Sequence, residues 1–392
     1  MITGPARPDR LRQRAPAAAA RTLARARSAA VIGCCLAALL GAGLTARPAR
    51  AASPAPATAI VLTGHDLHDG TIVQAGPTYY MYGTMYKCGF QWNHRNTPFC
   101  GFGVESARSL SGPWTYRGLL FSPRALDNWG PDRGRTWDWV CGRAGTGCFN
   151  PRMVRRPDGV WMLWFNAPRD SLAYRAPAYY VMGCNGPAGP CGYQAGGPHG
   201  STHKPALRQC DDNGDFSIIT SGRAAAIICS QGTLAEQKLN YWWTDGTGQG
   251  STGLAGVHFA AASAAAAAVD GEGVGAYQLP GGSWEMVYST PGCGYCTGPP
   301  QLKTAGGATE VQAGYSTAPT MLGPWTPGPA NGGLLSTAYC TGQPRTVFSA
   351  DGQAWEWIDR WTGSDNETSA SVMLEPMAAS QAVPSTWRCA AP

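Results

Sequence analysis

The stretch Asn150–Asn166, which reads NPRMVRRPDGVWMLWFN, decides the fold of this chain. A polar residue and a proline precede an apolar run that reaches Val154. A charged turn containing Asp158-Gly159 then leads into a second apolar run, VWMLWF. Two runs rich in strand-forming residues, joined by a turn with Asp-Gly, are typical of a β-hairpin. The stretch therefore predicts two paired strands.

The same pattern occurs four more times, at starts that lie 57 to 81 residues apart. The other copies are Asp69–Thr84, Asp215–Ser230, Glu272–Thr290 and Gln343–Trp361. Each copy opens with a carboxylate or carboxamide side chain, and the intervals leave room for two further strands per unit. Units of about four short strands at such periods indicate propeller blades. The repeats therefore predict an all-β, five-bladed β-propeller, with a β-sandwich as the alternative.

The first 51 residues have the features of a secretory signal peptide. An arginine-rich start precedes the short apolar run Val31–Ala46, and Ala49-Arg50-Ala51 offers a small-residue cleavage pattern. The apolar run is too short, and too close to that pattern, to predict a transmembrane helix. We therefore expect residues 1–51 to be removed. Residues 52–392 are expected to form one propeller domain, secreted and without membrane contact.

The basic charge of the chain lies in this leader. Residues 1–51 hold nine Arg and one Asp, a net charge of +8, whereas the whole chain carries +6, so the remaining residues carry about −2. Because the excess of arginine leaves with the leader, it is no argument for a nucleic-acid partner.

Twelve of the fourteen cysteines remain once Cys34 and Cys35 are removed. An even number of cysteines in a secreted chain predicts disulfides. The expected pairs are Cys88 with Cys100, Cys141 with Cys148, Cys184 with Cys191, and Cys340 with Cys389. Zinc at Cys293-x-x-Cys296 is disfavoured because no second CxxC or HxxxH lies nearby. No organic cofactor is implied, and no clear motif encodes the structural calcium ion that a propeller channel could hold.

The first strand of each propeller blade lines the central channel, so the starts of these strands converge. The five opening residues are Asp69, Asn150, Asp215, Glu272 and Gln343. Glycoside hydrolysis needs one carboxyl group to protonate the leaving oxygen and another to activate water on the opposite face of the sugar. Aromatic residues near the starts would stack on sugar rings. These are Trp92, Trp137, Trp139, Trp242, Trp243, Tyr295 and Trp361.

The order of these residues resembles glycoside hydrolase family 43, five-bladed propellers that cleave glycosidic bonds with inversion. The resemblance covers nearly all of the chain after the leader. It implies that Asp69, within His68-Asp69-Gly70-Thr71-Ile72, is the general base and that Glu272, followed by Gly273, is the general acid. Asn150 stands where the family carries a second Asp that tunes the acid. The resemblance therefore implies that Glu272 lacks a nearby charge that would raise its pKa.

A narrower resemblance is to the exo-β-1,3-galactanase branch of that family. It rests on the sequence HDGTI, on the run Pro151–Phe165, and on Gln343 together with Asp359-Arg360-Trp361. In that branch a Gln at the position of Gln343 can serve as the catalytic base, so the base is open between Asp69 and Gln343. The residues expected to bind the sugar are His68, Trp92, Asn150, Asp215, Arg360 and Trp361.

The expected function is therefore that of an inverting, exo-acting hydrolase of a polysaccharide or oligosaccharide, working as a monomer. Two alternatives stay open. The loss of a carboxylate at Asn150 favours a catalytically weakened, carbohydrate-binding propeller. An α-L-arabinofuranosidase or β-xylosidase of the same family would differ only in the shape of its pocket. Asp211-x-Asn213-x-Asp215 is similar to the start of a calcium loop, but the twelfth position is Gly222, which favours a polar turn.

Overall fold

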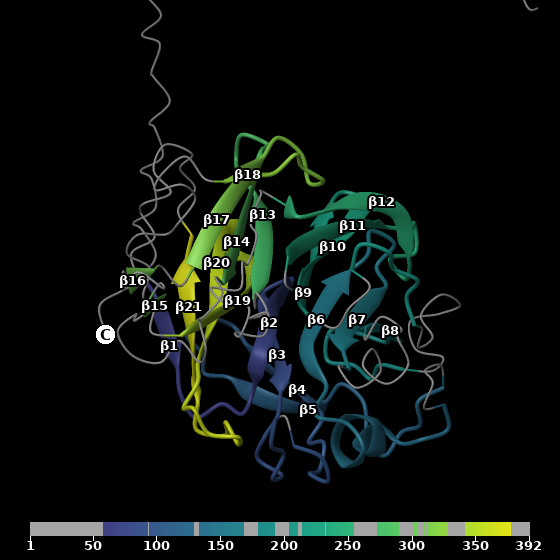
Figure 1. The fold of residues 1–392 in the computed structure, drawn as a ribbon. Coiled ribbons are helices and arrows are strands. Elements are labelled where there is room, and N and C mark those ends of the chain that lie inside the picture. The colour runs from purple at the N-terminus through teal and green to yellow at the C-terminus, as the bar shows by residue number, and fades with distance from the viewer. Residues whose placement is uncertain are drawn as a thin grey trace, which may run out of the picture. The chain divides into compact units, whose positions relative to one another are not determined.

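Five antiparallel sheets of three or four strands form the blades of a β-propeller (Figure 1). The computed structural model describes residues 58–92, 94–128, 133–167, 179–192, 204–210, 214–231, 233–254, 273–289, 302–303, 309–310, 313–327 and 342–377. All of them lie in one compact unit, Ala55–Pro392. The predicted fold class is confirmed.

The strands follow one another outward in each blade. The innermost strands are β2 (His68–Ala75), β6 (Phe149–Arg155), β9 (Asp215–Ser221), β13 (Val274–Gln278) and β19 (Gln343–Ala350). Their partners are β3 (Thr78–Thr84), β7 (Trp161–Asn166), β10 (Ala224–Gln231), β14 (Trp284–Ser289) and β20 (Gln353–Arg360). Outside these lie β4 (Phe102–Ala107), β8 (Tyr179–Cys184), β11 (Thr233–Leu239), β17 (Ala313–Ala318) and β21 (Ser371–Pro376). The outermost strands include β5 (Thr115–Leu119), β12 (Gly246–Thr252) and β18 (Thr326–Pro327). Two short strands, β15 (Leu302–Lys303) and β16 (Thr309–Glu310), form a separate pair. The element η1 (Trp139–Arg143) is a π-helix.

Each of the five sequence repeats is the inner hairpin of one blade. The stretch Asn150–Asn166 contains most of β6 and all of β7. The turn between them has Gly159 in a left-handed conformation (φ 93°) that suits glycine. The other copies become β2–β3, β9–β10, β13–β14 and β19–β20. The repeat prediction is therefore confirmed, and the predicted channel residues that the structure describes, Asp69, Asn150, Asp215 and Gln343, stand at or next to the starts of the inner strands.

Hydrophobic side chains fill the seams between neighbouring blades. The sequence of strand β7 is apolar throughout rather than alternating, because both faces of the strand are buried. Leu163 and Phe165 pack in the cluster between the first and second blades, whereas Met162 and Trp164 pack in the cluster between the second and third. A strand whose two faces are both buried reads as a continuous apolar run. Trp137 and Trp243 are also buried in these clusters, so they pack the core and do not offer sugar platforms.

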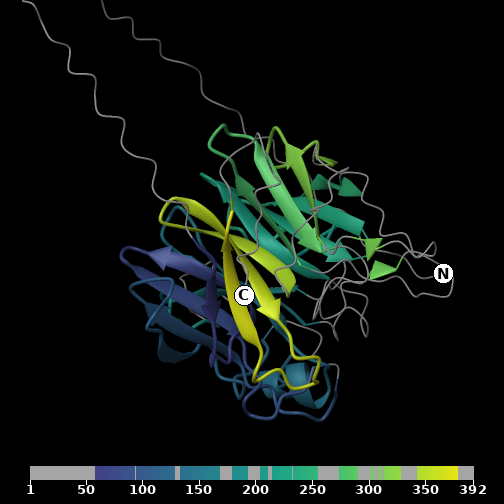
Figure 2. The ribbon, with the colours of Figure 1, turned by 90° about the vertical axis from the view of Figure 1, so that its left-hand side faces the viewer.

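The last blade is completed from the other end of the chain. Strand β1 (Ile60–Leu62) pairs antiparallel with β21, and Leu62 lies opposite Val372. Figure 2 shows β19, β20 and β21 of this blade in yellow, facing the viewer. Because β1 precedes the first blade in sequence, its pairing with the fifth blade closes the ring of blades and covers an edge that would otherwise be exposed.

Four disulfides staple the described part of the chain. Cys88–Cys100, Cys141–Cys148 and Cys184–Cys191 confirm the predicted pairs, and Cys210–Cys229 is a fourth. Cys293, Cys296, Cys340 and Cys389 lie outside the described residues. Several disulfides fit an oxidising compartment. Among the helices that are described, none is long and apolar enough to cross a membrane.

The seam between the fourth and fifth blades should make stability depend on pH. Glu356 is 1% exposed, and neither of its carboxylate oxygens has a hydrogen-bond partner among the described residues. Burial, followed by repulsion from Glu375 and Glu285, raises the pKa of Glu356 well above 4.5. The folded protein then binds more protons than the unfolded chain, so stability falls as pH rises above about 4.5.

We expect a lower Tm at pH 8 than at pH 5, and a smaller difference in Glu356→Gln, which cannot ionise. For each group, the free energy of unfolding changes by at most about 1.4 kcal/mol per pH unit in this window. Calorimetry at both values measures the effect. Asp365→Asn, at an exposed carboxylate, is the control and should keep the wild-type slope. Equal slopes in wild type and Glu356→Gln would contradict this assignment.

Candidate active site

The starts of the inner strands bring four of the five predicted channel residues into one described neighbourhood. Asp215 Oδ1 accepts a hydrogen bond from the Asn150 side-chain amide at 2.7 Å. Asp215 Oδ2 accepts the backbone N–H of Gly273 at 2.9 Å. Glu272 itself lies outside the described residues, but Gly273 follows it directly. The contact therefore links the third blade to the fourth.

Arg152 holds the inner strands together from within the channel. An innermost strand has no further strand on its inner edge, so backbone groups there need other partners. The Arg152 guanidinium donates to the backbone oxygens of Asp69 (2.6 Å), Gly70 (2.8 Å), Phe216 (3.0 Å) and Arg345 (3.4 Å). Burial, followed by repulsion from Arg345, lowers the pKa of Arg152 to about 10. The side chain nevertheless stays charged near neutral pH.

A second buried arginine, Arg345, supplies the counter-charge for the carboxylates. Its Nη1 lies 2.6 Å from Asp215 Oδ2, and its Nη2 donates to Asp215 Oδ1 at 3.0 Å. The same Nη2 donates to Asn150 Oδ1 at 2.8 Å. Asp359 Oδ2 lies 3.9 Å from Arg345 Nε. The planar fork of an arginine suits such a two-oxygen contact, so Arg345 fixes Asp215 and Asn150 relative to each other.

Asp69 is buried at the entrance to β2 in an unusual backbone conformation. Its φ of 48° is left-handed, which costs a non-glycine residue about 1 to 2 kcal/mol. The β2–β3 register shifts between His68 and Thr71, as in a β-bulge. Asp69 Oδ1 accepts a hydrogen bond from Thr84 Oγ1 at 2.7 Å. Burial raises the pKa of Asp69 to about 6, although the nearby Arg345 opposes the shift.

Asn150 repeats this geometry in the second blade. Its φ is 57°, and the β6–β7 register shifts between Phe149 and Arg152. The side chain is fully buried, donates to Asn166 Oδ1 at 3.2 Å, and accepts from Arg152 and Arg345. Two left-handed residues at equivalent strand starts are a form of strain that clusters at functional sites.

Gln343 and Trp361 are brought together as a pair. The Trp361 indole N–H donates to Gln343 Oε1 at 2.6 Å, which fixes the orientation of the amide. The His68 ring packs beside Trp361 and Tyr86, with centroid distances of 5.6 and 5.5 Å. Burial lowers the pKa of His68 to about 3, so its ring is neutral at physiological pH.

The remaining two predicted sugar contacts lie away from this cluster. The backbone N–H of Trp92 donates to the carbonyl of Asp365 at 3.0 Å, in a contact between two loops. Arg360 is half-buried at the end of β20, and no hydrogen bond or ion pair joins its side chain to the described residues. Neither side chain is joined to Asp69 or Asp215 by a contact among the described residues.

Three residues of the cluster were missed by sequence reasoning: Arg152, Arg345 and Asp359. A signal for the arginines exists. Asn150-Pro151-Arg152 and Gln343-Pro344-Arg345 place an arginine two residues after the start of an otherwise apolar strand in two repeats. A charge repeated within a buried strand calls for a partner in the channel. The sequence pattern did not indicate a site role for Asp359, because this residue lies in the second strand of its blade and not at the start of an inner strand.

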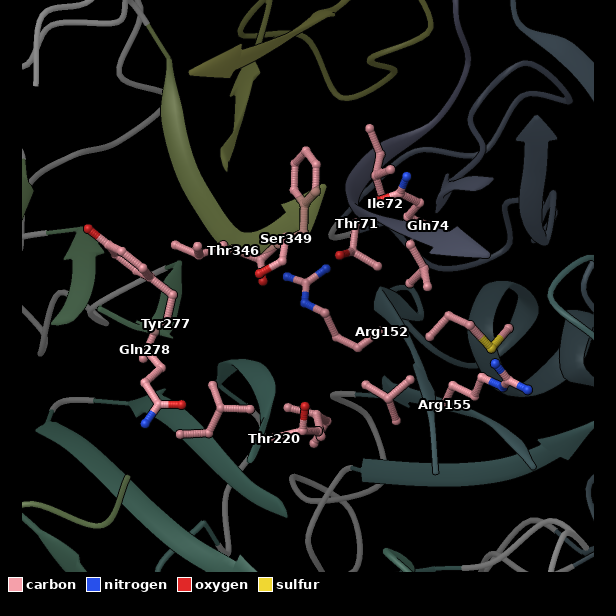
Figure 3. Close-up of a pocket in the computed structure, with 18 of the residues that line it drawn as sticks. Thr71, Ile72, Gln74, Arg152, Arg155, Thr220, Tyr277, Gln278, Thr346 and Ser349 are labelled. Carbon is pink, nitrogen blue, oxygen red and sulfur yellow. The ribbon is translucent and has the colours of Figure 1, made fainter. Parts of the chain in front are cut away.

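A cavity of about 430 Å³ lies along the later parts of the inner strands (Figure 3). All five innermost strands contribute to it, and the Arg152 side chain extends into it in Figure 3. Among the described residues that line it, none carries a carboxylate and none is a predicted catalytic residue. The described carboxylates gather instead at the strand starts, and that cluster is the candidate active site. No group of three or more His, Cys, Asp or Glu in the described part of the chain is arranged to hold a metal ion.

No protein-family model matches the sequence, and no curated protein sequence matches it. Solved structures do match its fold. The exo-β-1,3-galactanase of Phanerochaete chrysosporium with β-1,3-galactotriose has a TM-score of 0.58 and 16% identity, over 83% of this chain and 66% of that one. The exo-β-1,3-galactanase of Clostridium thermocellum has a TM-score of 0.54 and 15% identity, over 82% of this chain and 63% of that one.

A GH43 β-1,3-galactosidase with galactodeoxynojirimycin has a TM-score of 0.53 and 14% identity, over 80% of this chain and 91% of that one. The chain spans slightly less than two thirds of the first two structures. At these identities the likeness is one of fold. The chain thus has the five-bladed propeller fold of the glycoside hydrolase family 43 exo-β-1,3-galactanases and β-1,3-galactosidases.

Proposed function

We propose that this protein is a secreted, inverting glycoside hydrolase that releases galactose from the end of a β-1,3-galactan. The observation that carries the proposal is the acidic cluster at the strand starts. Burial raises the pKa of the Asp69 carboxyl group to about 6, and Asp215 accepts the N–H of Gly273, which follows Glu272 in the sequence. An acid and a base at one mouth of a propeller are the groups that inversion requires.

Asp215 supplies the charge that Asn150 lacks. Its carboxylate accepts the N–H of Gly273, the residue that follows Glu272 in the sequence. A like charge nearby raises the pKa of a carboxyl group and keeps it protonated. Glu272 can then act as a general acid, while Asn150 orients Asp215 through its amide. This arrangement favours an active hydrolase over a weakened, carbohydrate-binding propeller.

Asp69 is the better candidate for the base. An amide does not titrate, and the Gln343 oxygen already accepts the Trp361 N–H. In the proposed reaction, Glu272 gives its proton to the glycosidic oxygen as the bond from that oxygen to the anomeric carbon breaks. Water attacks the same carbon from the opposite face and loses its proton to Asp69. Gln343 orients the water, and Trp361 packs against the sugar ring, with the fully buried His68 ring behind it.

The arginine-rich leader and the four disulfides support the proposed secretion. Cystines of this kind persist in an oxidising, extracellular setting. Arg360 and Trp92 remain candidates for contacts with a longer substrate, outside the cluster itself.

The test is sugar release from β-1,3-galactan, arabinogalactan, arabinan and xylan, with proton NMR of the first anomer formed. We expect monomeric galactose from β-1,3-galactan, released first as the α-anomer, because inversion changes the configuration of a β-linkage. Release from arabinan or xylan alone would overturn the galactan assignment. Binding without release from any polymer would favour the carbohydrate-binding reading.

A further inference from the structure

Asp359 is a fully buried carboxylate that the proposed reaction does not use. It lies on β20, the second strand of the fifth blade, directly opposite Gln343 in the β19–β20 register. Its side chain nevertheless reaches the first blade, where Oδ2 accepts the backbone N–H of Asp69 at 2.7 Å. The contact crosses from the last blade to the first, at the ends of a ring that the chain must close.

The N–H that Asp359 accepts belongs to a left-handed residue at a shift in strand register. A bulge leaves a residue without a place in the ladder, so its backbone N–H must find another acceptor. A carboxylate is the strongest acceptor that a side chain can offer to such a group. Asp359 therefore stabilises the backbone conformation from which the Asp69 carboxyl group reaches Thr84.

Asp359 accepts one further hydrogen bond, and two more nitrogen atoms lie near its carboxylate. The Trp357 indole N–H donates to its Oδ1 at 3.1 Å. His68 Nδ1 lies 3.9 Å from Oδ1, and Arg345 Nε lies 3.9 Å from Oδ2. Burial raises the pKa of Asp359 to about 7, with Arg345 opposing the shift and Asp69 adding to it. A side chain fixed by these contacts can place its partner accurately.

We propose that Asp359 is a positioning residue that sets the backbone of Asp69, and thereby aims the Asp69 carboxyl group at the attacking water. The inference rests on the proposed function for its catalytic meaning. Its structural part stands on the hydrogen bond and the left-handed φ alone. Asp359 is not expected to touch the sugar.

The experiment compares Asp359→Asn with Asp359→Leu. The Asn carbonyl can still accept the Asp69 N–H, whereas the similarly sized Leu cannot. We expect Asp359→Leu to lower kcat on β-1,3-galactan about 10- to 100-fold with KM changed less than about threefold, as for loss of an interaction made only in the transition state. Asp359→Asn should restore kcat to within about fivefold of wild type. Trp357→Phe removes the indole N–H that donates to Asp359 Oδ1, and its kcat should lie between those of the two Asp359 variants.

Crystal structures of the same variants report on positioning without any need for activity. Residue 69 should keep a positive φ in Asp359→Asn and move to a negative φ in Asp359→Leu. The inference is overturned if Asp359→Leu leaves φ unchanged or keeps wild-type kcat, or if a folded Asp359→Asn is more than about tenfold slower than wild type. Should Asp359→Leu fail to fold, Asp359→Asn and Trp357→Phe still decide the question. If the wild type releases no sugar, the proposed function fails, and the crystal structures alone test the positioning role.

Discussion

Replacing Glu272 with Gln is expected to lower kcat/KM on β-1,3-galactan by about 10²- to 10⁴-fold, the range for loss of a general acid. Gln has nearly the same shape but no proton that it can give to the leaving oxygen. The proposed role of Asp215 bears on this expectation, because its carboxylate accepts the N–H of Gly273, the residue that follows Glu272 in the sequence. Initial rates of galactose release measure the effect.

The identity of the leaving group makes this test specific. The dinitrophenolate leaving group of a dinitrophenyl β-galactoside departs without protonation. If Glu272 is the acid, the rate at which Glu272→Gln hydrolyses this substrate should therefore stay within about tenfold of the wild-type rate. Asp158→Asn is the control, because Asp158 lies in the β6–β7 turn, where it pairs with Arg156. It should keep the wild-type rate. An equal loss on both substrates in Glu272→Gln would indicate a damaged fold and contradict the assignment of the acid.

Replacing Arg345 with Met is expected to destabilise the protein by about 3 to 5 kcal/mol, because it leaves buried carboxylates without their cation. Arg345 contacts both oxygens of Asp215 and lies 3.9 Å from Asp359. Met fills much of the volume but carries no charge. Denaturant unfolding at pH 7 measures the loss of stability. We also expect a lower kcat, because Asp215 and Asn150 both lose the Arg345 hydrogen bonds that hold them together.

The loss caused by Arg345→Met should shrink as pH falls. Without the cation, the Asp359 carboxylate loses the attraction that lowers its pKa, so the folded variant binds more protons and its loss of stability becomes smaller toward acid. Arg155→Met is the matched control, since Arg155 is exposed and packs over the Trp161 ring. It should cost about 0.5 kcal/mol or less, as most surface substitutions do. An equal loss in both variants would contradict a special role for Arg345.

Local patterns in the sequence were sufficient to predict the blades. The hairpin from Asn150 to Asn166 and its four copies were predicted because apolar strand-forming runs and turn residues are local features, and the same pattern recurs along the chain. The short disulfides Cys88–Cys100, Cys141–Cys148 and Cys184–Cys191 followed for the same reason. Cys210–Cys229 was not predicted, although it is also fairly local, because proximity in sequence does not determine which cysteines of a longer set meet.

The sequence alone determined that the chain is a five-bladed propeller and that Asp69, Asn150, Asp215 and Gln343 stand at the starts of its inner strands. Only the tertiary structure decided how these residues are joined. Asp215 proved to be the carboxylate beside Gly273, and Asp359 crosses from the fifth blade to the first. The physical reason is that the inner strand edges and buried charges must find partners in other blades. Those partners are far away along the chain, so no local period encodes them.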